Sequence, residues 1–137
     1  MAAKVLIDPF LSINGTNLTV YTRKVTLPLE REDLDSTTAG SGGAKEHAKG
    51  LESGELEVEF LDSFGVGEVD AVLYAAFKAD AAVAFEVRAD SDAVAVTNPK
   101  WTGFLQVTEY GIGGDVGQLA MKSQKFPTTG PTVRATA

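Results

Sequence analysis

His47 is the only histidine of the 137-residue sequence, and histidine is the side chain with the widest chemical use near neutral pH. The chain has no cysteine and no second histidine that could join His47 in a zinc site. Catalysis by a Ser–His–Asp group needs a rigid platform, whereas the stretch before His47 is rich in glycine. The residues therefore predict a solvated histidine, with no catalytic residue and no metal site.

Two other patterns resemble ligand-binding motifs but lack required positions. The glycines between residues 111 and 117 suggest a phosphate loop, but the dinucleotide fingerprint needs glycine at its sixth position and a helix afterwards. Counted from Gly111, the sixth position is Val116, and the following residues have the pattern of a strand. Asp90 and Asp92 begin like a calcium-binding loop, without its later glycine and glutamate. Turns explain both stretches, and the sequence predicts no cofactor.

A row of three carboxylates is the strongest remaining candidate for a functional surface. Glu55, Glu57 and Glu59 alternate with three apolar residues, Leu56, Val58 and Phe60. This period of two predicts a strand with one buried and one solvated face. Side chains two apart on one strand are ~7 Å apart, whereas a glycosidase takes its two carboxylates from opposite sides of a cleft. The row is therefore either an ordinary solvated face or a surface kept acidic for repulsion.

The acidic strand is the returning half of a long predicted hairpin. The outgoing half covers residues 23–30, where Lys24 is placed to relieve the repulsion between the glutamates. Pro28 lacks a backbone donor, so this half is either an edge strand or has its proline nitrogen pointing off the sheet. The connection from residue 32 to 50 is predicted as a long inter-strand loop, and loops of that size are usually functional or disordered.

The remaining segments predict a mainly β fold with one helix. Apolar residues at helical spacing between residues 66 and 79 indicate the single helix, which must pack against a sheet because it is short. Strands on both sides of one helix favour an antiparallel β-sandwich or half-barrel with the helix packed on it. The whole chain, residues 1–137, is predicted to form one domain. The later strands are predicted at residues 82–88, 93–97, 101–110, 117–126 and 132–136.

Charge and hydropathy exclude several classes of partner. The net charge of −7 disfavours ordinary nucleic-acid binding, because an acidic surface repels phosphates. No segment reaches the ~20 apolar residues of a membrane helix, and the apolar run at residues 5–7 is too short for a signal peptide. The expectation is a soluble protein made in the cytoplasm, with no membrane partner.

Several stretches also carry a family resemblance. Residues 98–110 (Asn-Pro-Lys-Trp-Thr-Gly-Phe-Leu-Gln-Val-Thr-Glu-Tyr) are followed by 113–119 (Gly-Gly-Asp-Val-Gly-Gln-Leu) and 122–126 (Lys-Ser-Gln-Lys-Phe). Upstream lie residues 13–18 (Ile-Asn-Gly-Thr-Asn-Leu) and 21–25 (Tyr-Thr-Arg-Lys-Val), the second of which runs into the hairpin. In sequence and in order, these stretches resemble the major tail (tail tube) proteins of long-tailed phages, especially phages of actinobacteria.

The resemblance implies a small β-sandwich with one helix, whose copies form six-membered rings that stack into a tube in the virion. Its partners would be other copies of itself, the tape measure and other tail proteins, with assembly in the host cytoplasm. DNA would be a non-specific passing cargo of the lumen, and no cofactor or enzymatic activity is implied.

The resemblance also suggests roles for two sets of residues. Glu55, Glu57 and Glu59 would line an acidic lumen along which DNA slides. The loop from residue 32 to 50 would order on a neighbouring subunit or ring. Its candidate contact residues are Leu34, Thr37, Lys45, His47 and Lys49.

Other readings of the sequence stay open. A related virion β-sandwich, such as a tail terminator, a head–tail joining protein or a capsid decoration protein, fits the same pattern. A carbohydrate- or protein-binding module would instead show clustered exposed aromatic residues, for which Trp101, Phe104 and Tyr110 are the candidates. An enzyme is the class with the least support in the residues.

Overall fold

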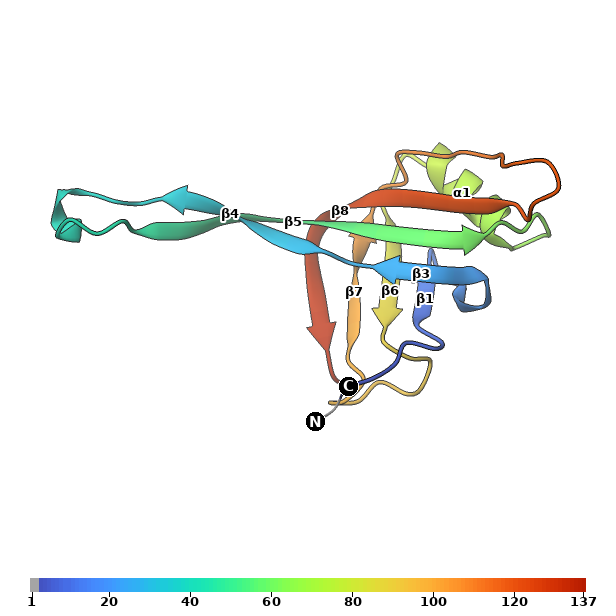
Figure 1. The fold of residues 1–137 in the computed structure, drawn as a ribbon, viewed down its shortest axis with the longest axis horizontal. Helices are drawn as coiled ribbons and strands as arrows, with labels where there is room; N and C mark the ends of the chain where they lie inside the picture. Colours follow the sequence, from blue (N-terminus) through green and yellow to red (C-terminus); the bar gives the residue numbers. More distant parts are fainter. Residues whose placement is uncertain (1–2) are drawn as a thin grey trace.

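The computed structural model describes residues 3–137. The described chain forms one antiparallel β-structure with a single α-helix, α1 (Val69–Lys78), and two short 3-10 helices, η1 (Thr19–Tyr21) and η2 (Ala39–Ser41). Strand order in the sheet is β2-β1-β6-β7-β8-β5-β3, and β4 also pairs with β5 (Figure 1). The strands are β1 (Phe10–Ile13), β2 (Thr16–Asn17), β3 (Thr22–Thr26), β4 (Leu29–Asp35), β5 (His47–Leu61), β6 (Val83–Arg88), β7 (Lys100–Leu105) and β8 (Met121–Ala135).

This architecture confirms the predicted fold class: mainly β, antiparallel, curled into a half-barrel, with one packed helix. Of the two alternatives for residues 23–30, the edge position is confirmed, because β3 ends the sheet and β4 pairs with β5 alone. Pro28 lies in the break between these two strands, and its carbonyl accepts a hydrogen bond from the Glu55 amide at 3.2 Å. No helix in residues 3–137 has the length and apolar character needed to cross a membrane.

The core lies between the two curled halves of the sheet. Leu56, Val58 and Phe60 of β5 are buried, as their alternation predicts. They pack with residues of the opposite half, including Leu11 of β1 and Phe85 of β6. α1 adds its buried stripe of Val69, Leu73 and Ala76 to the same cluster.

β8 corrects the prediction of two separate strands at 117–126 and 132–136. It is one strand that pairs first with β5, up to Pro127, and then with β7, from Thr128 onward. A register shift opposite Gly103 places extra residues in β8, where Gly130 has a positive φ of 75° and Pro131 has no donor to pair. The glycine–proline pair bends the strand, and the bend joins the two halves of the sheet.

Three other predicted segments differ in the structure. Residues 93–97 form no strand beyond a single bridge, because the buried side chain of Asn98 donates to the carbonyls of Asp92 and Ala93 and gathers them into a turn. The strand predicted at 101–110 ends at Leu105. The loop predicted from 32 to 50 is shorter in the structure, since β4 extends to Asp35 and β5 begins at His47.

Candidate assembly surfaces

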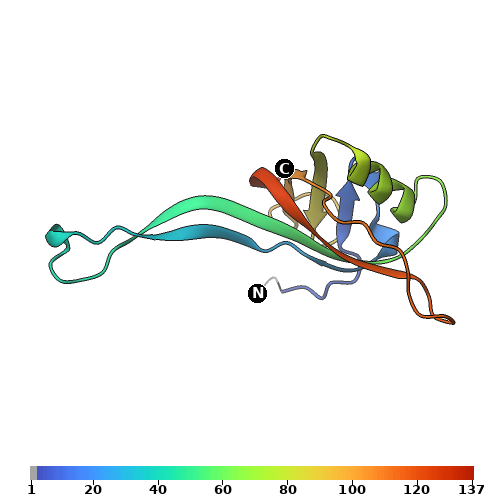
Figure 2. The same ribbon diagram turned by 90° about the horizontal axis from the view of Figure 1, so that it is seen from above.

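The hairpin that carries the predicted loop is an arm that extends from the body of the molecule (Figures 1 and 2). We define the arm as residues 29–54, comprising β4, the tip and the first half of β5. Every residue of β4 is exposed, and β4 pairs only with β5. Strands that rest on a single neighbour bury little apolar surface, so a two-stranded ribbon is marginally stable by itself in water.

The tip of the arm is held by its own polar contacts. The Thr37 hydroxyl accepts a hydrogen bond from the Glu46 amide at 2.8 Å and donates to the Glu46 carbonyl at 3.3 Å. Asp35 accepts from the Thr37 amide at 2.9 Å, and hydrogen bonds from Thr37 hold the pKa of the Asp35 carboxyl below its usual range. Gly42 and Gly43 have positive φ angles, which turn the chain back towards β5.

All five predicted contact residues lie on this arm and are exposed. The Nδ1 atom of His47 is 2.9 Å from an Asp33 carboxylate oxygen, and Lys49 is the cross-strand partner of Asp33. Leu34 is 48% exposed and lies opposite Ala48. The five are Leu34, Thr37, Lys45, His47 and Lys49.

The acidic row lies where the alternation places it. Glu55, Glu57 and Glu59 are partly exposed on β5, on the face opposite the buried residues of that strand. Lysines on both neighbouring strands flank the row. Lys24 of β3 is the cross-strand partner of Glu59, and the Nζ atom of Lys125 on β8 is 3.5 Å from Glu57. The surface therefore carries mixed charge in which the carboxylates are partly neutralised.

A buried polar cluster connects β8, α1 and the end of β5. The ammonium of Lys122, which is 2% exposed, lies 3.3 Å from a carboxylate oxygen of Asp62 and 3.3 Å from one of Asp70. The Tyr110 hydroxyl hydrogen-bonds Asp70, and the Lys122 ammonium lies 4.3 Å from the centre of the Tyr110 ring. This arrangement attaches the start of α1 to the sheet.

Sequence reasoning missed this cluster. From the local sequence, the apolar Met121 is a better candidate for an inward-facing side chain than the charged Lys122. Only the apolar Phe126 indicates that the even-numbered positions of this strand face the core. The hydrogen bond to Asp70 and partial burial raise the pKa of Tyr110 to about 12, because both disfavour the phenolate. The cluster is consistent with a structural role.

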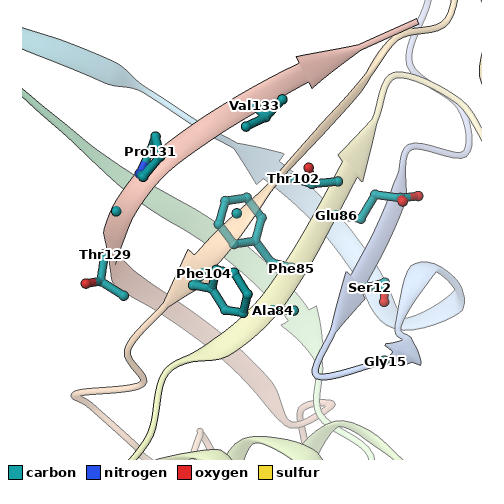
Figure 3. Close-up of a pocket in the computed structure, with 12 residues that line it drawn as sticks. Ser12, Gly15, Ala84, Phe85, Glu86, Thr102, Phe104, Thr129, Pro131 and Val133 are labelled. Atoms are coloured by element: carbon teal, nitrogen blue, oxygen red, sulfur yellow. The ribbon is translucent and has the colours of Figure 1, made fainter. Parts of the chain in front are cut away.

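An apolar groove of about 540 Å³ lies on the outer face of the sheet, on the side away from the core (Figure 3). Phe104 of β7 and Val133 of β8 are each 54% exposed there, and Thr102 of β7 and Ala84 of β6 line the same surface. The bend of β8 at Pro131 forms one wall. We call this surface the outer groove; its other lining residues are Ser12, Gly15, Phe85, Glu86, Gly103, Thr129 and Gly130.

Gly103 allows the wall of the outer groove to approach β7. A side-chain carbon at Gly103 would lie 3.2 Å from Phe85 Cε1 and 3.3 Å from the carbonyl oxygen of Pro131. Both contacts are tighter than ordinary packing. The glycine therefore lets β8 arch closely over β7 while the Phe85 ring fills the core side.

The three aromatic candidates for a binding module lie on different surfaces. Trp101 lines a small cavity with Leu6 and Val25, Phe104 lines the outer groove, and Tyr110 packs edge-on against Tyr74 of α1, with ring centres 5.3 Å apart. They do not form the shared aromatic platform that the module hypothesis requires. Within residues 3–137, no three histidine or acidic side chains gather closely enough to hold a metal ion.

No protein-family model matches the chain, and no curated protein sequence matches it. Solved structures do match. A chain in the virion of a native gene transfer agent (GTA) particle is 15% identical, with a TM-score of 0.77 over 97% of this chain and 99% of that one. A chain in the tail of an empty GTA particle with C6 symmetry is 17% identical, with a TM-score of 0.71 over 95% of each chain.

The protein shares the fold of these particle chains. The match to the tail chain leaves out 5% of 137 residues, which is about seven residues, whereas the arm contains 26. Most of the arm is therefore included in the likeness together with the body.

Proposed function

We propose that this protein is a structural subunit of a phage or phage-like tail tube. Its copies self-assemble into hexameric rings, the rings stack, and the resulting tube is a conduit for DNA. The observation that carries this proposal is the likeness, over nearly the whole of both chains, to a chain of a C6-symmetric GTA tail. Catalysis has no part in this role.

The physical features of the chain agree with assembly. β3 and β4 lie at the edge of the sheet and offer backbone groups to another copy, and an exposed edge in a stable protein normally needs a cover. The arm exposes apolar side chains, including Leu51 at 75%, which no part of its own body covers. In a ring, neighbouring copies would pair with this sheet edge and cover these apolar side chains.

The acidic row belongs to this proposal as a lumen surface. Glu55, Glu57 and Glu59 point away from the core along one strand, so adjacent copies would repeat the row around a ring. Carboxylates repel DNA phosphates and would keep the cargo from adhering. Lys24 and Lys125 weaken this repulsion without removing it, because three carboxylates face two ammonium groups.

Negative-stain electron microscopy of the purified protein, alone and with tail-assembly partners, tests the proposal. We expect rings or hollow rods with six subunits in cross-section. Monomers that persist at high concentration, in both preparations, would contradict the tube and favour a capsid decoration role.

The lumen assignment has its own experiment. Changing Glu55, Glu57 and Glu59 together to Lys should leave tube formation intact and slow DNA release from particles, because the changed surface attracts phosphates. Release kinetics are measured against particles with a matched triple change to Lys at exposed residues of the arm, Glu30, Glu32 and Glu52. Equal rates for both sets of particles would remove these glutamates from the lumen.

A further inference from the structure

The arm contains one uncharged cross-strand pair beyond its root. Of the registered pairs between residues 30 and 53, all of which the structure describes, four include a charged residue or His47. The fifth is Leu34 with Ala48. Leu34 is 48% exposed, so this pair presents a small apolar surface on a ribbon whose other registered pairs in this range are charged or contain His47. An apolar pair of this kind fits an apolar surface that contains few charges.

The outer groove has the matching character. Its most exposed large side chains are Phe104 and Val133, and the one ionisable residue in its lining is Glu86. The Glu86 carboxylate is already 3.0 Å from the Arg88 guanidinium. An aliphatic side chain that fills the groove would therefore bury apolar surface, and it would leave no buried charge without a partner.

The arm of a copy does not reach the groove of that same copy. Its root is fixed to β8, where the Thr128 hydroxyl donates to the Gly54 carbonyl at 3.1 Å. From there the arm extends away from β6 and β7 in both views (Figures 1 and 2). β4 begins at Leu29 and places Leu34 roughly 17 Å along the arm, about half the width of a body of about 110 residues. The pair therefore lies far enough from its own root to contact a neighbouring body.

We propose that Leu34 and Ala48 of one copy's arm pack into the outer groove of a second copy, against Phe104 and Val133. The contact joins two different surfaces of the same chain, so it is heterologous and repeats from copy to copy. This inference rests on the proposed tube function, because C6 rings and their stacking need such head-to-tail contacts. In this contact, the arm of one copy inserts into the outer groove of the next copy.

Cysteine cross-linking tests the contact, because the chain has no cysteine of its own. Leu34→Cys and Val133→Cys are prepared as separate proteins, mixed under assembly conditions and mildly oxidised. A disulfide requires the two Cβ atoms to approach to about 4 Å, so it reports direct packing. We expect a disulfide-linked dimer that contains one copy of each variant, visible on a non-reducing gel.

Val116→Cys is the matched control, because Val116 is fully exposed in the loop between β7 and β8. The dimer yield of Leu34→Cys with Val133→Cys should exceed that with Val116→Cys by about tenfold, since docking raises the effective concentration of one thiol near the other. Adding Phe104→Ser to the Val133→Cys protein should lower this yield. Adding Phe64→Ser, at a position of similar exposure, should leave it unchanged.

The outcomes separate this inference from the proposed function. Rods that form without the Leu34–Val133 cross-link, or with equal yield at Val116, would overturn the arm-to-groove contact and leave the tube intact. The cross-link without rings or rods would support the contact and count against the tube. Absence of both would overturn both.

Discussion

The arm and the body of this molecule are built from one continuous strand, β5, but they are stabilised differently. In the body half, Leu56, Val58 and Phe60 are buried against two neighbouring strands and the opposite half of the sheet. In the arm half, the same strand has one neighbour and its side chains are mostly exposed. The comparison shows that backbone pairing alone can continue a strand beyond the body, whereas the stability of the fold comes from apolar burial on one face of the strand.

The largest expected difference between the two regions comes from truncating apolar side chains of β5. Phe60→Ala should lower the free energy of unfolding by about 3–5 kcal/mol, because Phe60 is fully buried. Leu51→Ala in the arm should change it by less than about 0.5 kcal/mol, because Leu51 is 75% exposed. Urea unfolding followed by Trp101 fluorescence measures both. Comparable losses would mean that the arm is as strongly packed as the body.

Two lysines of β8 sharpen the comparison through charge. Lys122→Met should destabilise the fold by about 3 kcal/mol, because it leaves the buried carboxylate of Asp62 without a cation. Lys125→Met, on the outer face of the same strand, should cost under about 1 kcal/mol, because its contact with Glu57 is exposed to water. Chemical denaturation of both variants at neutral pH is the measurement. A small effect at Lys122 would refute the structural role of the polar cluster.

The hydroxyl of Tyr110 gives the body an alkaline pH dependence, whereas the arm contains no tyrosine. Its pKa is raised from 10.0 to about 12 in the folded protein, so folding favours the neutral phenol. This contribution is complete below about pH 10 and is lost as the pH rises towards 12.

Wild-type protein should therefore be more stable than Tyr110→Phe below pH 10, and the gap should narrow above it. Unfolding free energies of both proteins across this range test the effect. A gap that stays constant with pH would contradict the raised pKa.

Removing most of the arm should also have only a small effect on the stability of the body. Replacing residues 32–51 by Asn-Gly joins the cross-strand partners Arg31 and Glu52 through a tight turn. The free energy of unfolding of the body should change by less than about 1 kcal/mol, because the ribbon is marginally stable. Under the proposed function, ring and rod formation should be lost, as seen by electron microscopy. Intact rods from this variant would deny the arm any part in assembly.

The sequence predicted the elements whose own side chains alternate clearly. The faces of β5 and β6 and the apolar stripe of α1 follow from local patterns. Local periodicity is sufficient there, because each element has one strongly apolar face and one polar face. The half-barrel class follows from the order of these elements.

Contacts between distant segments determined the strand ends and the buried polar groups, which local sequence patterns do not encode. Residues 32–35 and 47–50 have no apolar alternation, and they are strands because each pairs with the other. β8 passes through Gly130 and Pro131 as one strand because β5 and β7 hold its two halves. Lys122 faces inward because Phe126 sets the register. Composition and periodicity thus determined which faces are apolar, whereas contacts between distant segments determined where strands end and which polar groups are buried.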